Sequence, residues 1–261
     1  MRTELFLNKT VEQNAAVYYE KAKKARQKLA GAEKAIAEAQ RKLAALLKEK
    51  DKQLSELEKE QPRAAPGKKE WYEKFHWFTS SEGFLCIGGR DATSNEIAVK
   101  KHAEAGDWVF HADIPGSPFF VVKKGQEAGA ATLQEAAQAT AAYSKAWKLG
   151  VTTLDVFAVK PEQASKTAKA GEYMGKGAFM IYGQKRYFHP ILEVAVGVTQ
   201  EGRVVGGPVE AIKKQAEKHA VAVPGRQKTS DAAKKIKKMI GGSVDEIVPF
   251  LPGGGCEVMG G

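Results

Sequence analysis

The longest regular pattern of apolar and polar positions runs from about Val11 to Lys59 and is typical of an α-helix. This segment has no proline and one glycine, and small or apolar residues recur in it at alternating steps of four and three: Tyr18, Ala22, Ala25, Leu29, Ala32, Ile36, Ala39, Leu43 and Leu46. A helix of this length extends about 70 Å, which is more than one small domain can cover. We therefore predict a coiled-coil arm over residues 1–61, in which a seam through Leu29, Ile36 and Leu43 pairs with another helix, in a homodimer or within the chain. A single solvated helix is the alternative.

The pattern changes after the arm. Residues 62–70 combine prolines, a glycine and basic side chains, so we expect a linker there. Over residues 71–205, short apolar runs alternate with turn residues, which predicts an α+β core with a mixed, mainly antiparallel sheet and flanking helices. The first two expected strands form a hairpin, and Thr132 with Glu135 is expected to cap the second helix. The expected strands are Phe75–Phe78, Phe84–Ile87, Trp108–Asp113, Phe119–Lys123, Val151–Lys160, Gly177–Tyr182 and Ile191–Val198, and the expected helices are Asn95–Glu104 and Thr132–Leu149.

The last segment, residues 206–261, is predicted to be a basic helical extension that ends in a glycine-rich tail. We expect helices at Val209–His219 and Ser230–Ile240, with Val221–Gly225 between them, and a mobile glycine-rich end after Leu251. The lysines that make these two helices basic are Lys213, Lys214, Lys218, Lys234, Lys235, Lys237 and Lys238.

Charge narrows the set of partners. The chain of 261 residues has a formal net charge of +10 and an isoelectric point near 9.4, which favours anionic partners such as nucleic acid or an acidic membrane surface. No apolar run is long enough to span a membrane and no signal peptide is recognisable, so we expect a cytoplasmic protein with no membrane partner. The two cysteines, Cys86 and Cys256, are expected to be reduced and to form neither a disulfide framework nor a metal site.

Catalytic and metal chemistry find little support in the sequence. The run Gly171–Gly177 resembles a phosphate-binding P-loop, but it is one residue too short and lacks the Ser or Thr after its lysine. A turn that presents Lys176 to a phosphate and a plain surface turn remain equal alternatives. His111 and Asp113 share one face of a strand, although two ligands are too few for a metal site, so a structural His111 is favoured. We therefore expect no cofactor, no bound metal and no enzymatic activity.

Basic residues beside strand ends and turns are the remaining candidates for function. Cations that neutralise phosphates suit structured RNA. Trp77 and Trp108 lie in apolar strands and are expected to be core residues rather than stacking platforms. The candidate RNA-binding residues are Arg90, Lys100, Lys101, His111, Lys123, Lys124, Lys166, Lys176, Lys185 and Arg186.

Several motifs, in a fixed order, resemble the NFACT-R domain of the NFACT family, and particularly its archaeal-type members. The resemblance covers nearly the whole chain. The matching runs are Asn14–Lys24, Trp71–Phe78, Ile87–Ala92, Asn95–Glu96, Lys100–Lys101, Gly106–Ile114, Ser165–Ala168, Gly171–Tyr173 and Gly206–Ile212.

The resemblance implies a role in ribosome-associated quality control. Proteins of this family bind obstructed large ribosomal subunits that carry peptidyl-tRNA, and they recruit tRNA for untemplated extension of the stalled chain, while the ribosome makes the bonds. The implied partners are thus the large ribosomal subunit, rRNA and tRNA. The family's tRNA-recognising N-terminal domain does not precede the arm in this sequence, so we expect a fragment or a short form that binds RNA or ribosomes. The alternative is a coiled-coil protein-interaction module without direct RNA binding.

Overall fold

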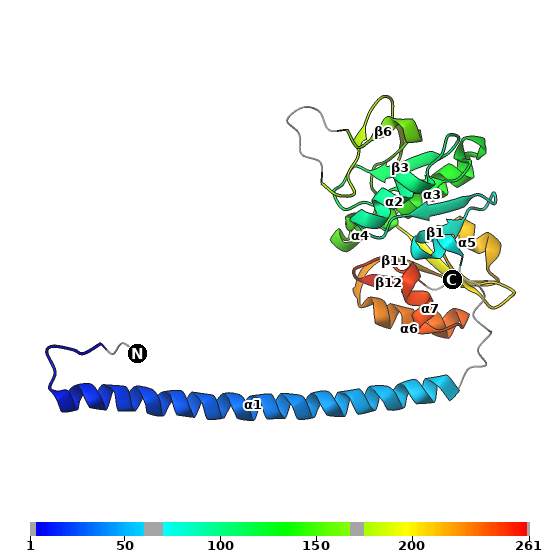
Figure 1. The fold of residues 1–261 in the computed structure, drawn as a ribbon. Coiled ribbons are helices and arrows are strands. Elements are labelled where there is room, and N and C mark those ends of the chain that lie inside the picture. The colour runs from blue at the N-terminus through cyan, green and yellow to red at the C-terminus, as the bar shows by residue number, and fades with distance from the viewer. Residues whose placement is uncertain (1–3, 60–69, 168–174, 260–261) are drawn as a thin grey trace. The chain divides into compact units, whose positions relative to one another are not determined.

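The computed structural model describes residues 4–59, 70–167 and 175–259 (Figure 1). The chain divides into two units, residues 1–68 and residues 69–261, each of which is described by itself.

The first unit is dominated by one long helix, α1 (Val11–Lys59). Asn14 is buried at its start, where the side-chain amide donates to the backbone oxygens of Phe6, Lys9 and Thr10 and ties the preceding turn to the helix. The seam of the helix lies open to solvent, with 61% of Leu29, 58% of Ile36 and 59% of Leu43 exposed. The long helix of the predicted arm is confirmed, and its pairing with a second helix stays a prediction.

The second unit is built on a six-stranded sheet, in which every neighbouring pair of strands is antiparallel. The predicted hairpin is confirmed, because β1 and β2 pair from His76 opposite Gly88 to Thr79 opposite Leu85. The strands in their order across the sheet are β1 (His76–Thr79), β2 (Leu85–Gly88), β4 (Phe120–Val122), β3 (Trp108–Ala112), β5 (Val156–Val159) and β8 (Arg186–Phe188).

The two faces of this sheet have different covers. One face packs against α3 (Ala130–Ala142) and α4 (Lys145–Leu149), in a core that includes Phe110, Phe120 and Trp147. The other face packs against α2 (Ala92–His102) in a smaller core with Phe119, Phe157 and Val121. A two-stranded sheet of β6 (Ala164–Ser165) and β7 (Met180–Ile181) adjoins this smaller core through Ala164 and Ile181. The predicted α+β class is therefore confirmed.

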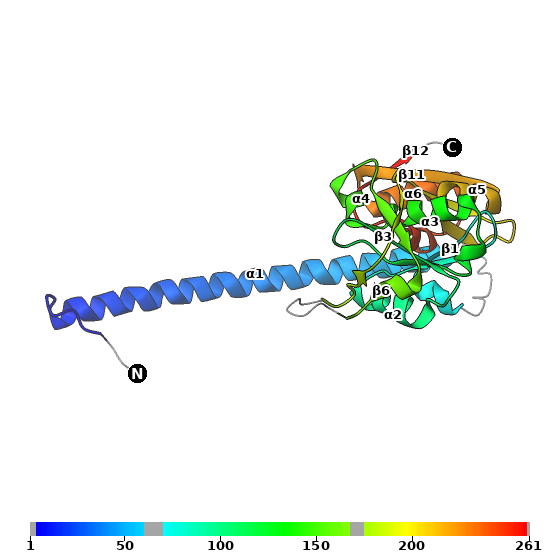
Figure 2. The same cartoon turned by 90° about the horizontal axis from the view of Figure 1, so that it is seen from above.

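A four-stranded antiparallel sheet completes the second unit (Figure 2). Its order is β10 (Val204–Gly207), β9 (Val194–Val198), β11 (Lys218–Gln227) and β12 (Cys256–Met259). Helix α5 (Val209–Gln215) packs against Ala195 and Val205, whereas α6 (Thr229–Ile240) joins the large core with Val194 and Val196. Because neighbouring residues of a strand point to opposite faces, the two helices cover opposite faces of this sheet. The remaining short helices are η1 (Trp71–Lys74), η2 (Gly125–Glu127), η3 (Pro161–Gln163), α7 (Val244–Ile247) and η4 (Val248–Phe250).

The prediction for the C-terminal segment was wrong in two places. The helix expected to reach His219 ends at Gln215, and Val221–Gly225, which was expected only to connect the two helices, lies within β11. The tail expected to be mobile forms β12, which pairs with β11 and buries Cys256. Pro224 is tolerated within β11 because the register shifts between Pro224 and Gln227, as at a β-bulge. The boundary predicted between residues 205 and 206 falls inside β10. Whether the predicted boundaries separate independent domains stays a prediction.

Helix α3 was also predicted incorrectly. The single helix expected from Thr132 to Leu149 is broken near Ser144, whose hydroxyl oxygen caps α4 by accepting from the backbone N–H of Ala146. Thr132 is not a cap, because α3 already begins at Ala130 with Gly129 at the cap position, and the N–H of Thr132 donates to the carboxylate of Glu82 in the β1–β2 hairpin. The carboxylate of Glu135 accepts instead from the backbone N–H of Ser81. The hydrogen-bond partners of Thr132 and Glu135 therefore lie in the β1–β2 hairpin, whereas the sequence predicted that the two residues would cap the helix.

Candidate nucleic-acid interface

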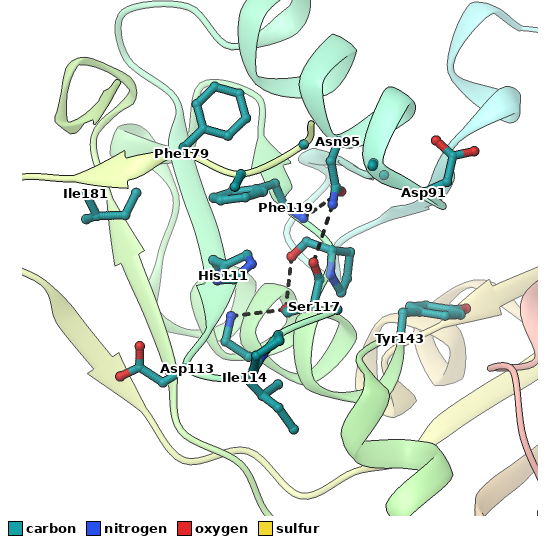
Figure 3. A pocket seen from close by; sticks show the side chains of 18 of the residues that line it. Asp91, Asn95, His111, Asp113, Ile114, Ser117, Phe119, Tyr143, Phe179 and Ile181 are labelled. Atoms are coloured by element: carbon teal, nitrogen blue, oxygen red, sulfur yellow. Dashed lines mark hydrogen bonds between the residues drawn. The ribbon is translucent and has the colours of Figure 1, made fainter. Parts of the chain in front are cut away.

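A pocket of about 770 Å³ opens on the α2 face of the six-stranded sheet (Figure 3). Its base is formed by residues of β3 and β5 and by Phe119 before β4, and its sides come from the start of α2, the turn between β3 and β4, and the segment around β7. Its lining includes Arg90, Asn95, His111, Phe119, Lys176 and Phe179.

Aromatic rings form one wall of this pocket. His111 stacks on Phe119, with ring centroids 4.1 Å apart and planes inclined by 28°, and Phe179 meets Phe119 edge to face at 5.1 Å. Figure 3 shows the three rings one above another. Burial lowers the pKa of His111 to about 4, against an attraction from Asp113 that raises it, so the imidazole is neutral at physiological pH. A neutral imidazole offers one hydrogen-bond donor and one acceptor.

The turn between β3 and β4 is held against α2 by one side chain, Asn95. Its carbonyl oxygen accepts from the backbone N–H of Phe119 at 2.9 Å, and its amide donates to the backbone oxygen of Ser117 at 3.4 Å. The hydroxyl oxygen of Ser117 accepts in turn from the N–H of Ala112 at 3.1 Å. Gly89 is required beside this contact, because a Cβ there would lie 2.1 Å from the Asn95 oxygen. The pocket wall is thus fixed by hydrogen bonds rather than by packing alone.

Three of the predicted cations line the pocket: Arg90, Lys176 and Lys185. Arg90 and Lys176 are exposed, and neither forms an ion pair with any residue that the structure describes. One guanidinium nitrogen of Arg90 donates to the backbone oxygen of Phe75 at 3.0 Å, which leaves its other nitrogens to contact an anion. Lys185 is more enclosed: its ammonium lies 4.0 Å from the centroid of Phe157 and 3.7 Å from a carboxylate oxygen of Asp113. Arg90 therefore meets Lys176 and Lys185 at one site, although more than eighty residues of sequence separate it from either lysine.

Lys100 and Lys166 lie next to this site and share one carboxylate. Glu96 lies 2.6 Å from the ammonium of Lys100 and 3.3 Å from that of Lys166, and it accepts from the N–H of Gly177. The hydrogen bond from Lys100 is the main cause that lowers the pKa of Glu96 to about 2. Lys166 also lies 5.0 Å from the centroid of Phe179. Both lysines are thus partly neutralised, and Lys166 supports the aromatic wall.

The other predicted cations lie elsewhere. Lys123 and Lys124 follow β4 at the end of the sheet away from Arg90, since β2 and β4 run antiparallel. Lys123 contacts the buried carboxylate of Asp107 at 2.7 Å, which is a structural contact. Arg186 pairs with Ala158, whose side chain belongs to the α3 face, and so points away from the pocket. Lys101 is exposed on α2 but does not line the pocket.

Sequence reasoning missed Asn95, Phe119, Phe157 and Phe179 as parts of the site. A signal was present, because the runs Ile87–Ala92, Asn95–Glu96 and Gly106–Ile114 all contribute to the pocket. The run Gly171–Tyr173 lies outside the described residues.

The described part of the chain shows neither a metal site nor a disulfide. There, no three His, Cys, Asp or Glu side chains are grouped so that they could hold a metal ion. Cys86 and Cys256 are buried and unpaired, and burial raises the pKa of both thiols. Among residues 4–59, 70–167 and 175–259, no helix combines the length and the apolar character needed to cross a membrane.

Comparison with known proteins gives a consistent result. Residues 74–183 match the model of the NFACT protein RNA binding domain. The chain is 41% identical over 199 residues to the archaeal Rqc2 homolog aRqcH of Methanocaldococcus jannaschii, which covers 73% of this chain and 30% of that protein. It is 38% identical over 192 residues to the ribosome quality control complex subunit NEMF homolog of Drosophila melanogaster, and 40% identical over 183 residues to human NEMF. These two matches cover 71% and 68% of this chain but only 18% and 16% of the relatives. The chain therefore spans less than a third of the length of these relatives.

Proposed function

Because this chain belongs to the NFACT family, we propose that it is the RNA-binding and ribosome-binding part of a ribosome-associated quality control factor. The observation that carries the proposal is the convergence of Arg90 and Lys176, which both lie in the segment that matches the RNA binding domain, with Lys185 just beyond that segment, on one pocket. The names of the relatives supply the setting, since they are subunits or homologues of ribosome quality control factors.

In its finer form, the proposal names the partners and the process. The chain binds obstructed large ribosomal subunits through rRNA and tRNA, and it supports the untemplated tailing of stalled nascent chains. It acts in the cytoplasm as a binding module and not as an enzyme, and the bond-making step belongs to the ribosome. A neutral His111, cations and aromatic rings suit the binding of RNA and do not form a nucleophile with an adjacent base.

The physical basis is the release of counterions. Cations that contact phosphates displace ions condensed on the RNA, so log affinity falls linearly with log salt concentration. A site that contacts about four to six phosphates gives a slope of roughly −3 to −5. The exposed Arg90 and Lys176 are the cations best placed to make such contacts, because Lys100, Lys166 and Lys185 already face carboxylates.

Paired charge reversals test this proposal. Fluorescence anisotropy with a labelled, partly single-stranded RNA is measured between 50 and 300 mM salt for the wild type, for Arg90→Glu/Lys176→Glu and for Lys235→Glu/Lys238→Glu. Lys235 and Lys238 are exposed on α6, so the second variant has the same charge change on another element. We expect the pocket variant to bind at least about tenfold more weakly, with a slope smaller by about 2, because each lost phosphate contact removes about one unit.

The α6 variant is expected to stay within about threefold of the wild type. A loss of binding in the α6 variant alone would move the interface to the C-terminal lysines. A wild-type chain that binds no RNA at any salt concentration would contradict the proposed function.

A second function is favoured by the exposed seam of α1. A coiled-coil protein-interaction module would use Leu29, Ile36 and Leu43 to pair with a partner helix, as a homodimer or in a complex. A measurement of RNA binding distinguishes this function from the RNA-binding one, since a coiled-coil interaction module would bind a partner helix but no RNA.

A further inference from the structure

The pocket encloses more volume than the binding of phosphates requires. Phosphates of an RNA backbone bind to exposed cations on a flat surface, and they do not need an enclosed volume. A volume of about 770 Å³ lies within the range of about 300 to 1,000 Å³ that is usual for sites of small organic ligands. The cavity therefore has room for a group that leaves the RNA strand.

The walls of the pocket are suited to a flat aromatic group. Phe179, Met180, Ile181 and Ile114 are only half buried and line the cavity with apolar atoms. Phe179 is held in place by the edge-to-face contact with Phe119 and by the ammonium of Lys166. A base that enters can thus pack against a wall whose rings are already fixed, and little side-chain entropy is lost on binding.

The polar groups inside the pocket suit the edge of a base. Asn95 and Ser117 are committed to the turn between β3 and β4, so they serve the wall rather than a ligand. His111 lines the pocket as a neutral ring, and a neutral imidazole can offer a hydrogen bond to the polar edge of a base without bringing a charge. Arg90 and Lys176 are the exposed cations of the lining, whereas the ammonium of Lys185 lies against Phe157 and near the carboxylate of Asp113.

We propose that this pocket receives one unpaired nucleotide of an RNA strand, with its base against the wall formed by Phe179, Phe119 and His111 and its phosphate at Arg90 and Lys176. The proposal rests on the proposed RNA-binding function and adds a substrate class to it. A base within a duplex is stacked and paired on both sides and cannot enter, whereas a base in a loop, a bulge or a single strand can be turned outward and stacked on aromatic side chains.

A variant that fills the pocket without a change of charge tests the proposal. Ala178 lines the cavity and is exposed, so Ala178→Trp places an indole where the base would lie. Ala105→Trp is the matched control, because Ala105 is also exposed but lies in the loop before β3, outside the pocket. Phe179→Ala is the second variant, and it removes part of the aromatic wall. Thermal unfolding of each variant reports whether the fold is retained.

The probe is a hairpin RNA with a single-nucleotide bulge, made with 2-aminopurine at the bulge, with an ordinary base there, or with an abasic site there. For the wild type and Ala105→Trp, we expect a change in 2-aminopurine fluorescence on binding and an affinity for the base-bearing RNA roughly tenfold above that for the abasic RNA. Ala178→Trp and Phe179→Ala should lose this preference, and both should retain salt-dependent binding to the abasic RNA. Titration with AMP and with UMP tests whether the pocket binds a free nucleotide rather than a nucleotide within an RNA strand.

The outcomes separate the two proposals. Equal wild-type affinity for base-bearing and abasic RNA would overturn the nucleotide pocket and leave the proposed function intact. The absence of binding to either RNA would overturn both. Binding of AMP or UMP that Ala178→Trp abolishes, without any preference for base-bearing RNA, would assign the pocket to a free nucleotide and would also overturn the proposal.

Discussion

The side-chain carbonyl oxygen of Asn95 accepts a hydrogen bond from the backbone N–H of Phe119, and the two atoms are 2.9 Å apart. This contact joins the first turns of α2 to the residue that precedes β4. Because Phe119 carries the stacked ring of His111, the position of the aromatic wall depends on Asn95.

Replacement of Asn95 should therefore loosen the pocket. We expect Asn95→Ala to lower the free energy of unfolding by about 1 to 3 kcal/mol, since the buried N–H of Phe119 loses its partner. Asn95→Asp is the comparison variant: one carboxylate oxygen still accepts from Phe119, while the other faces the backbone oxygen of Ser117 without a proton to donate, so an intermediate loss is expected. Urea unfolding measures the difference. Equal midpoints for Asn95→Ala and the wild type would show that the bond contributes nothing.

Lys123 is expected to stabilise the fold rather than to bind RNA. Its ammonium lies 2.7 Å from Asp107, of which only 2% is exposed, and it also donates to the backbone oxygen of His102. Lys123→Met should cost about 2 kcal/mol, because a buried carboxylate loses a charged partner. The backbone N–H of Lys124 still donates to Asp107, which limits the loss.

The neighbouring variant Lys124→Met is the control. The side chain of Lys124 is exposed, so the change should remain within about 0.5 kcal/mol. Chemical denaturation and RNA binding are measured for both variants. A Lys123→Met chain with wild-type stability and weakened RNA binding would show that Lys123 belongs to the interface instead.

Acid should destabilise the fold through two half-buried histidines, His76 and His111. Burial is the main cause that lowers the pKa of His76 to about 3 and that of His111 to about 4, from the ordinary value of about 6.5. The unfolded chain therefore binds protons between about pH 6.5 and pH 4 that the folded chain does not bind. Stability is full above this window and falls as the pH falls through it, by up to about 1.4 kcal/mol per pH unit for each histidine.

Urea midpoints at pH 7.5, 6.0 and 5.0 measure this slope. His76→Phe and His111→Phe should each reduce it, because each removes one titrating group and keeps an aromatic ring at the stacking position. A slope below pH 6.5 that stays the same in the double variant would assign the acid sensitivity to other groups.

The seam of α1 should control association. Leu29→Lys/Ile36→Lys places charges on the exposed apolar stripe and should lower the helix content or the mass in solution. Ala30→Lys/Ala37→Lys is the matched control, with the same charge and the same spacing one residue away, on positions that are also exposed. Circular dichroism and sedimentation equilibrium report the two quantities. If neither changes in the seam variant, the helix does not pair through this stripe.

The elements that sequence predicted well are local. The β1–β2 hairpin, α2 and α6 follow from apolar spacing and nearby turn residues within about a dozen positions. β11 was missed because its alternating residues are short of bulky apolar side chains and are flanked by lysines, which suggested a continued helix. β12 was missed because the glycines before it hid a four-residue strand whose partner lies more than thirty residues upstream.

The sequence predicted some of the cations of the site but not how they are arranged in space. Sequence identified Arg90 and Lys176 as cations near turns, but only the fold brings the turn after β2 next to Gly177, where a Cβ would lie 2.6 Å from the Cα of Ala92. The same fold removes Lys123 from the interface by pairing it with Asp107, sixteen residues away. Long-range strand pairing decides both outcomes, and no local pattern contains that information.

Co-sedimentation with separated ribosomal subunits is the most direct test of whether the pocket cations bind this chain to the large subunit. The wild-type chain, the Arg90→Glu/Lys176→Glu variant and the Lys235→Glu/Lys238→Glu variant are each centrifuged with purified large or small subunits at low and high salt. We predict that the wild type and the α6 variant sediment with large subunits at low salt and are released at high salt, and that the pocket variant stays in the supernatant. Sedimentation of the pocket variant to the same extent as the wild type, or equal binding to both subunits, would contradict the account.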